Sequence, residues 1–327
     1  MHYDVFNGDA DGIIALLQLR LSKNKPYPKE SILITGVKRD ISLLKRVEVE
    51  TATSVTVLDV SLEKNSEALR HLLKNEVSVF YVDHHRAGDI PSSECLKTII
   101  NTDANTCTSL LINNYLNDEF VNWAVAAAYG DNMLASAEKL AKQHNLNDGQ
   151  QALLNELGIY INYNGYGRTV DDLHFAPDIL LEKLSNYKDP FDLINESGSV
   201  FHQLKAAYLS DMAKAKRSNI LFDHEVLSAV QLADEPWARR VSGVFGNELA
   251  NKSPNKAHAV VTLNAKSGNE TNTYTISLRA PLNNKQGAGD LCANYPTGGG
   301  RAAAAGINAL PEEMLSDFFD SVAVYYS

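Results

Sequence analysis

The sequence predicts an α/β protein in which a mostly parallel-sheet N-terminal domain is joined by a linker helix to a smaller α/β C-terminal domain. Short apolar strands alternate with amphipathic helical runs up to about residue 100, which is typical of βα units around a parallel sheet. Helical patterns dominate from about residue 107 to 160, and strand patterns return after about residue 220. We place the domains at residues 1–187 and 221–327, with the linker helix at 188–220.

The N-terminal pattern pairs each strand with a following helix. "YDVF" precedes "DGIIALLQLRLSK", "SILITGV" precedes "DISLLKRVEV", and "SVTVLDV" precedes "LEKNSEALRHLLKN". A fourth strand, "EVSVFYV", runs directly into Asp83-His84-His85. The helical stretch that follows contains "TSLLINNYL", "FVNWAVAAAY", "MLASAEKLAKQ" and "GQQALLNELGIYI".

The second half contains the linker and the smaller domain. The segment "SVFHQLKAAYLSDMAKAKRSN" predicts the linker helix. Strands are predicted in "VLSAVQL", "HAVVTLNA" and "TYTISLRA", and helices in "ARRVSGVFGNELANK" and "LPEEMLSDFFDSVAVYY". These alternations indicate a second α/β domain.

Composition limits the classes of function. The 327 residues are 44% hydrophobic and 21% charged, and no apolar run approaches the ~20 residues of a membrane span. Without a signal-like N-terminus, a cytoplasmic location is predicted. The net charge of −10 and the lack of a Lys/Arg block argue against a protein that binds long nucleic acid through its phosphate backbone. They favour a short anionic ligand. The three cysteines are far apart, so buried thiols are favoured over a zinc site, a disulfide or a catalytic thiol.

Carboxylates follow the predicted strands at consistent positions. They are Asp9 and Asp11 after the first strand, Asp59 after the third, Asp83 with His84 and His85 after the fourth, and Asp131 after an apolar helix. The carboxyl ends of parallel strands share one sheet edge, so these side chains can converge. Four clustered carboxylates repel one another unless cations neutralise them. Carboxylate oxygens with an imidazole suit Mn²⁺ or Mg²⁺, and two ions ~3.5–4 Å apart would activate a hydroxide for attack on phosphorus.

Each of these motifs also has a purely structural interpretation. Asp9 or Asp59 could cap a helix, Asp131 could lie in an ordinary loop, and the histidine pair could lie on the surface. The consistent placement of all of them at strand or helix ends favours a metal site.

Five motifs carry a resemblance to a known family: "GDADG", "VLDVS", "VDHH", "AAAYGD" and, at residues 295–308, "YPTGGGRAAAAGIN". In this order they resemble the DHH phosphoesterase family with the DHH-associated C-terminal domain, which includes nanoribonuclease-like and RecJ-like oligonucleotide phosphodiesterases. The resemblance covers nearly the whole chain. It implies a metal domain facing a substrate domain across a cleft.

The resemblance also implies roles for the individual side chains. Asp9 and Asp59 would bind one Mn²⁺, and the other would be bound by Asp11, Asp59, His84 and Asp131, with Mg²⁺ as the alternative metal. Asp59 would bridge the two ions. His85 would contact the scissile phosphate or handle a proton, and Asp83 would orient the two histidines.

Two positions depart from the family pattern. Nanoribonuclease-like and pyrophosphatase-like members have a histidine four residues before the first aspartate, where this chain has Val5. The first metal site is therefore poor in ligands, as in RecJ-type exonucleases. The glycine motif usually continues with histidine, where this chain has Arg301, a permanent cation and bidentate phosphate ligand.

A phosphate-binding set is predicted mainly in the C-terminal domain. The candidate cations are Arg279, Lys285 and Arg301, with Arg168 and its neighbouring tyrosines as a weaker candidate. Gly298, Gly299 and Gly300 would let backbone N–H groups approach a phosphate, and the run after them is predicted to be a helix with its N-terminus available.

The function predicted first is an Mn-dependent phosphodiesterase that hydrolyses short linear oligonucleotides, including dinucleotides such as pGpG and other nanoRNA, to nucleoside monophosphates. The alternatives are a RecJ-like single-strand exonuclease, a cyclic-dinucleotide phosphodiesterase and a non-catalytic nucleotide-binding sensor. Val5 disfavours a pyrophosphatase. The expected partner is the short substrate, not long duplex nucleic acid or a membrane, and the sequence leaves a homodimer open.

Overall fold

A computed structural model describes residues 1–28, 30–264 and 271–327. Ala265 of the predicted strand "HAVVTLNA" lies outside them. The chain forms two compact units, residues 1–206 and 207–327, and helix α9 (Val200–Ala215) contains the boundary. Both units combine helices with a sheet, which confirms the predicted α/β class.

Within the described part of unit 1, five parallel strands form one sheet in the order β2-β1-β3-β4-β5. Their bounds are β1 (His2–Phe6), β2 (Ile32–Ile34), β3 (Ser54–Leu58), β4 (Ser78–Asp83) and β5 (Leu96–Ile100). The chain leaves β1 for β2 on one side and then returns to β3 on the other. The strand order therefore reverses beside β1, which is where open α/β sheets bind their ligands.

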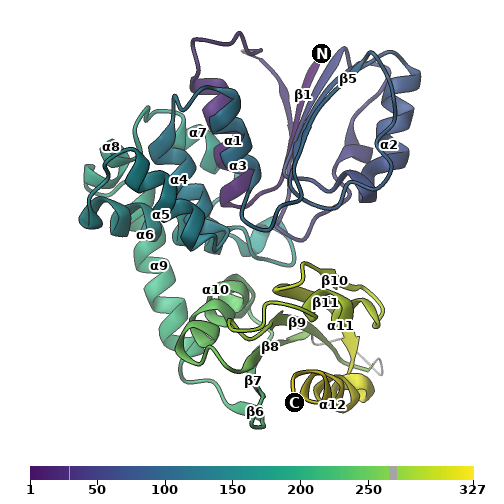
Figure 1. Cartoon of the computed structure of the whole chain (residues 1–327), viewed down its shortest axis with the longest axis vertical. Helices are drawn as coiled ribbons and strands as arrows, with labels where there is room; N and C mark the ends of the chain where they lie inside the picture. The colour runs from purple at the N-terminus through teal and green to yellow at the C-terminus, as the bar shows by residue number, and fades with distance from the viewer. Residues whose placement is uncertain (29, 265–270) are drawn as a thin grey trace. The chain divides into compact units, whose positions relative to one another are not determined.

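Helices cover both faces of this sheet (Figure 1). Helix α2 (Leu62–Lys74) packs on one face, and α1 (Ala10–Leu21) and α3 (Thr108–Tyr115) lie on the other. The central strands are buried on both faces, so they consist of apolar and β-branched residues with little alternation. The remaining helices of unit 1 are α4 (Val121–Gly130), α5 (Leu134–Gln143), α6 (Asp148–Asn164), α7 (Pro177–Leu184) and α8 (Pro190–Asn195), with the 3₁₀ turn η2 (Val170–Asp172).

One helix predicted in unit 1 is wrong. The segment "DISLLKRVEV" contains only the 3₁₀ turn η1 (Leu44–Arg46). The side chain of Asn65 on α2 satisfies the local backbone instead, because its Oδ1 accepts from Leu44 N at 3.2 Å and its Nδ2 donates to Ile41 O at 2.7 Å. These hydrogen bonds pair backbone groups that a helix would otherwise have paired, so Leu43 and Leu44 are buried without a helix. The strand β5, which pairs in parallel with β4, was not predicted.

The sheet of unit 2, over the residues described, is mixed and has the order β10-β11-β9-β8-β7-β6. Its strands are β6 (Ile220–Asp223), β7 (Leu227–Leu232), β8 (Ala257–Asn264), β9 (Thr273–Arg279), β10 (Gly298–Gly300) and β11 (Ala304–Pro311). Helix α10 (Pro236–Lys252) packs on β8 and β9, α11 (Ala288–Ala293) on β10 and β11, and α12 (Leu315–Tyr326) on β7, with the 3₁₀ turn η3 (Glu312–Met314) before α12.

The helix predicted after the glycine motif is also wrong. Residues 304–311 form strand β11, which pairs antiparallel with both β9 and β10. Alanine-rich sequence favours a helix, but Ala305, Ile307 and Leu310 are buried in the core of unit 2 when the segment is extended. Tertiary packing therefore overrides local propensity here.

In the described residues, no helix combines the length and the apolar character required to cross a bilayer.

A buried carboxylate, Asp4, ties helix α1 to strand β1. Asp4 is fully buried and accepts hydrogen bonds from Arg20 Nη2 and Ser31 Oγ, both at 2.6 Å, from His2 Nε2 at 3.1 Å, and from Tyr27 Oη. Burial alone would raise the pKa of Asp4, but these hydrogen bonds lower it below its ordinary value of 3.8. The ionised form of Asp4 therefore contributes stability at neutral pH, and this contribution is lost as the pH falls from about 4 through the lowered pKa.

We predict that Asp4→Asn lowers the free energy of unfolding at pH 7 by about 1.5–3 kcal/mol, the range for a hydrogen bond to a charged group. The difference from wild type should shrink below about pH 4. Urea unfolding at pH 7 and at pH 3 measures both values, with Asp171→Asn, at an exposed position, as the control. An equal difference at both pH values would show that the charge of Asp4 does not contribute.

Candidate metal centre

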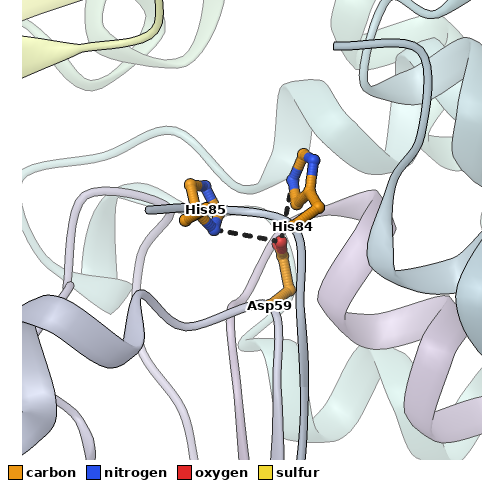
Figure 2. Close-up of side chains that lie close together, drawn as sticks. All are labelled: Asp59, His84 and His85. Atoms are coloured by element: carbon orange, nitrogen blue, oxygen red, sulfur yellow. Dashed lines mark ion pairs between the residues drawn. The ribbon is translucent and has the colours of Figure 1, made fainter. Parts of the chain in front are cut away.

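The carboxyl edge of the unit 1 sheet brings the two imidazoles of the DHH triplet next to an aspartate. Asp59 follows β3, and His84 and His85 follow β4. Figure 2 shows both rings directed at the Asp59 carboxylate, with His84 Nε2 at 3.3 Å and His85 Nδ1 at 3.7 Å from Asp59 Oδ1. The tight pairing of β3 with β4 places these side chains together.

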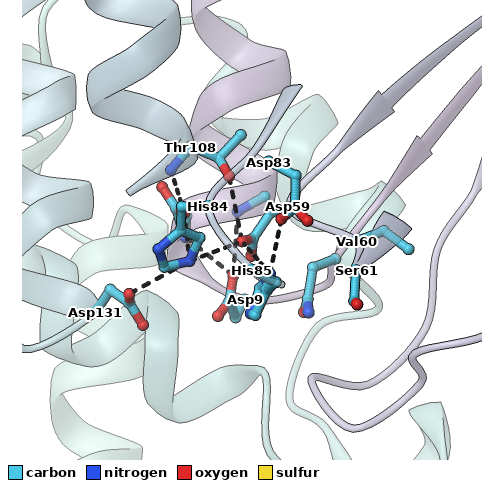
Figure 3. A network of polar contacts seen from close by, with 12 residues as sticks. Asp9, Asp59, Val60, Ser61, Asp83, His84, His85, Thr108 and Asp131 are labelled. Atoms are coloured by element: carbon cyan, nitrogen blue, oxygen red, sulfur yellow. Dashed lines mark hydrogen bonds and ion pairs between the residues drawn. The ribbon is translucent and has the colours of Figure 1, made fainter. Parts of the chain in front are cut away.

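His84 also faces two further carboxylates. Its Nε2 lies 3.8 Å from Asp11 Oδ2. It also lies 3.8 Å from Asp131 Oδ2 (Figure 3). On the other side of the ring, Nδ1 lies 2.9 Å from the carbonyl oxygen of Thr106. Since that carbonyl only accepts, Nδ1 carries the hydrogen, so in the neutral imidazole the lone pair of Nε2 is directed at the carboxylates. This is the arrangement of a metal-binding histidine.

Asp11 is oriented by the N-terminus of helix α3. Its Oδ2 accepts from Thr108 N and its Oδ1 from Ser109 N, both at 2.7 Å. Ser109 Oγ also donates to the Asp11 carbonyl at 2.8 Å. Each carboxylate oxygen has a second lone pair, so Asp11 can still bind an ion. Burial raises the pKa of Asp11, and the neighbouring His84 opposes this rise.

Asp59 has the conformation and the environment of a functional residue. Its backbone φ is +57°, in the left-handed region that only Gly, Asn and Asp adopt readily. It does not cap α2, and Thr108 Oγ1 donates to its Oδ1 at 3.3 Å. Burial, with the nearby charges of Asp11 and Asp9, raises the pKa of Asp59 well above its ordinary value. A bound cation would favour the ionised form of this carboxylate.

Asp83 contacts the second histidine of the triplet. Asp83 is fully buried, and its Oδ1 lies 2.7 Å from His85 Nδ1. The Nδ1 nitrogen is thereby engaged, and Nε2 is the nitrogen left for another partner. The His85 side chain is 32% exposed, whereas that of His84 is 3% exposed, so only His85 is accessible to a solvent-borne ligand.

Asp9 has a different partner, which sequence reasoning missed. The Lys38 ammonium, from the segment after β2, forms an ion pair with Asp9 Oδ2 and lies 3.5 Å from Asp131 Oδ1. Asp9 also caps α1, because its Oδ1 accepts from Asp11 N at 3.0 Å and Gly12 N at 3.1 Å. Burial would raise the pKa of Asp9, but Lys38 and these hydrogen bonds lower it. Burial would lower the pKa of Lys38, but Asp9 and other neighbours raise it.

The ligand atoms that lie close enough to share an ion form two overlapping groups. Among the residues described, one group is Asp59, His84 and His85, and the other is Asp11, His84 and Asp131, with the ligand atoms of each group within 4.8 Å of one another. Buried carboxylates beside an imidazole are the donor set of a Mn²⁺ or Mg²⁺ site. The residues present therefore fit a divalent ion beside His84 Nε2, which lies within 3.8 Å of an oxygen of Asp11, Asp59 and Asp131.

The three cysteines take no part in this donor set. Cys107 and Cys292 are buried, Cys95 is half-buried, and all three are free thiols. Cys107 lies at the start of α3, and burial raises the pKa of its thiol well above the ordinary value. The thiol is thus neutral at physiological pH, which makes it a poor nucleophile.

The predicted phosphate-binding residues of unit 2 lie in different environments. Arg279, at the end of β9, donates to Asn247 Oδ1 at 2.6 Å and to the carbonyls of Gly243 and Leu278, both at 3.0 Å. It therefore anchors β9 to helix α10, a structural role that the sequence did not suggest. Lys285 is exposed.

The glycine motif is an edge strand that ends in a tight turn. A Cβ on Gly298 would lie 1.8 Å from the carbonyl oxygen of Cys292, and one on Gly300 would lie 2.5 Å from Ala305 Cα, so packing alone requires glycine at both positions. A Cβ on Gly299 would meet open space. Arg301 follows in the turn between β10 and β11, with an exposed side chain. In unit 1, Arg168 is also exposed, in the segment between α6 and η2.

Comparison with solved structures identifies the fold. RecJ from Thermus thermophilus in complex with Mn²⁺ superposes with a TM-score of 0.62 at 15% identity, over 99% of this chain and 52% of that one. An exonuclease RecJ bound to manganese gives 0.56 at 17% identity, over 99% and 89%. A pGpG-specific phosphodiesterase, PggH from Vibrio cholerae, gives 0.52 at 11% identity, over 100% and 99%. The Thermus protein has also been solved with Mg²⁺.

The chain has the DHH phosphoesterase fold, which confirms the resemblance drawn from its motifs at the level of the fold. It spans about half the length of Thermus RecJ and nearly the whole length of PggH. No protein-family model and no curated protein sequence matches it.

We predict that Asp59→Asn separates metal binding from folding. Asparagine keeps the favourable left-handed backbone but removes a charge that is costly to bury. In EDTA the melting temperature should therefore rise by about 2–4 °C, which corresponds to ~1 kcal/mol, and the stabilisation of wild type by Mn²⁺ should be lost.

Thermal unfolding with EDTA and with Mn²⁺ checks both effects. The matched control is Asp118→Asn, which changes an exposed aspartate at φ +60° outside the centre and should leave the Mn²⁺ effect intact. An undiminished Mn²⁺ effect in Asp59→Asn would exclude Asp59 as a ligand.

Proposed function

We propose that this protein is a divalent-metal-dependent phosphodiesterase that hydrolyses short linear oligonucleotides, with dinucleotides such as pGpG preferred, to nucleoside monophosphates. The observation that carries the proposal is the convergence of three carboxylates on the inward lone pair of His84. Mn²⁺ is proposed as the preferred ion and Mg²⁺ as the alternative, in line with the ions bound by the RecJ structures.

The side chains of the centre would have different roles in the reaction. A divalent ion bound at this centre would act as a Lewis acid on a phosphoryl oxygen and would lower the pKa of a water molecule. Asp11, Asp59, His84 and Asp131 would hold it. His85, oriented through Nδ1 by Asp83, would use Nε2 to contact the scissile phosphate or to deliver a proton to the leaving oxygen.

Charge and size support a short substrate. The chain carries a net charge of −10, whereas backbone tracking of long nucleic acid requires a basic surface. PggH, which is named for a dinucleotide substrate, has this fold over its whole length. The terminal phosphate would be bound by Arg301 and the Gly298–Gly300 strand, with Lys285, Arg168 and the remaining donors of Arg279 as further candidates.

A single-strand exonuclease is the second candidate, because the two Mn²⁺-bound RecJ structures superpose with higher TM-scores than PggH does. A cyclic-dinucleotide phosphodiesterase and a non-catalytic nucleotide sensor are tested by the same substrates. We propose a cytoplasmic location, and a homodimer stays a prediction.

Turnover of a substrate series tests the function. With Mn²⁺, linear dinucleotides should be hydrolysed fastest, and rates should fall steeply beyond a few nucleotides. EDTA should abolish turnover, and Mn²⁺ should restore it better than Ca²⁺. Chromatography of di- to hexanucleotides, a long single strand and a cyclic dinucleotide measures this. Equal rates on dinucleotides and long strands would favour the exonuclease, and binding without hydrolysis would favour the sensor.

Arg301→Ala is predicted to lower kcat/KM on a dinucleotide by roughly ten- to a hundredfold. The lost charge-assisted hydrogen bond contributes about 1.5–3 kcal/mol, at ~1.4 kcal/mol per factor of ten. Arg301→Lys should recover part of the loss, since lysine keeps the charge but not the two-pronged hydrogen bonding of the guanidinium.

Steady-state kinetics measures this effect beside calorimetric titration with Mn²⁺, which should be unchanged because the proposed ligands are in unit 1. Arg217→Ala, at another exposed arginine of unit 2, is the control; unchanged kinetics in Arg301→Ala would remove Arg301 from the site.

A further inference from the structure

Lys38 places a permanent cation inside the cluster of carboxylates. Its Nζ is ion-paired with Asp9 Oδ2, lies 3.5 Å from Asp131 Oδ1, and donates to Asn162 Oδ1 on α6 at 3.0 Å. Only 21% of its side chain is exposed. The ammonium thus lies on the Asp9 side of the centre, while His84 lies on the side of Asp11 and Asp59.

The backbone around Lys38 holds it in this position. Its N–H donates to Gly165 O at 2.8 Å, and its carbonyl accepts from Asn7 Nδ2 at 3.3 Å. The segment after β2 can approach the segment after β1 because Gly8 has no side chain: a Cβ there would lie 1.9 Å from Gly36 O. The position of the lysine is therefore part of the fold and not one rotamer of a surface side chain.

Asp9 has little capacity left for an ion. One of its oxygens accepts two backbone hydrogen bonds, and the other is paired with Lys38. Among the described residues, neither group of ligand atoms close enough to share an ion includes Asp9. Val5, at the position where nanoribonuclease-like members of the resembled family carry a histidine, is fully buried in the apolar core and offers no ligand.

We propose that Lys38 takes the place of a second metal ion, so that the centre binds one divalent ion, held by Asp11, Asp59, His84 and Asp131. This inference deepens the proposed function and rests on its metal centre. It departs from the two-ion arrangement implied by the family resemblance. The ammonium neutralises Asp9 and one oxygen of Asp131, the charges that a second ion would otherwise balance.

Removal of the lysine should therefore create a second ion site. In Lys38→Gln the amide can still bond Asn162, but Asp9 and Asp131 lose their cation. We expect wild type to bind one Mn²⁺ per chain, with the electron paramagnetic resonance spectrum of an isolated ion. Lys38→Gln should bind a second Mn²⁺, with spin coupling between the two ions. Lys142→Gln removes one exposed lysine of unit 1 and should behave as wild type.

Calorimetry gives the stoichiometry and resonance gives the coupling, both on the full chain and without substrate. Two ions of similar affinity in wild type, or a coupled spectrum, would overturn the inference and leave the proposed phosphodiesterase intact. A single ion in a folded Lys38→Gln would also overturn it. No Mn²⁺ binding to wild type would overturn both the inference and the metal-dependent function. If Lys38→Gln does not fold, the wild-type stoichiometry still decides, and Lys38→Arg should retain it.

Discussion

The centre of this protein depends on the burial of like charges at one edge of a parallel sheet. Asp9, Asp11, Asp59 and Asp131 are each less than 9% exposed, and their mutual repulsion adds to the cost of removing them from water. Such a cluster persists only if cations or hydrogen-bond donors compensate it. In unit 1, a nearby lysine and backbone hydrogen-bond donors supply part of this compensation.

The four carboxylates are not neutralised or hydrogen-bonded to the same extent, and this difference indicates where a cation can bind. Asp9 is satisfied by the fold itself, through Lys38 and the start of α1. Asp11 receives the N-terminal amides of α3, but its pKa remains raised, and that of Asp59 is raised further, with a left-handed backbone in addition. The charge that is still uncompensated lies beside His84. We therefore place the proposed ion on the His84 side of the cluster and not on the Asp9 side.

The sequence was sufficient to predict what depends on periodicity and on strand ends. The α/β class, the strands β1 to β4 and the gathering of Asp11, Asp59, His84 and Asp131 follow from apolar runs and from the shared carboxyl edge of parallel strands. The sequence was not sufficient where residues that are distant along the chain replace local backbone hydrogen bonds. Asn65 satisfies the backbone of residues 41–44, and pairing with β9 extends the alanine-rich β11. Lys38 was missed although it follows a predicted strand, because a lysine beside an arginine after a strand suggests a surface charge. Only the close packing of the segments after β1 and β2 shows that it lies beside Asp9.

The central claim is that this edge of the sheet binds one divalent ion beside a fixed lysine. Anomalous diffraction at the manganese absorption edge, from crystals of the full chain grown with Mn²⁺, tests it most directly. We expect one anomalous peak in unit 1, coordinated by Asp11, Asp59, His84 and Asp131, with Lys38 still paired to Asp9. A peak between Asp9 and Asp59 with Lys38 displaced, or no peak at this edge, would contradict it.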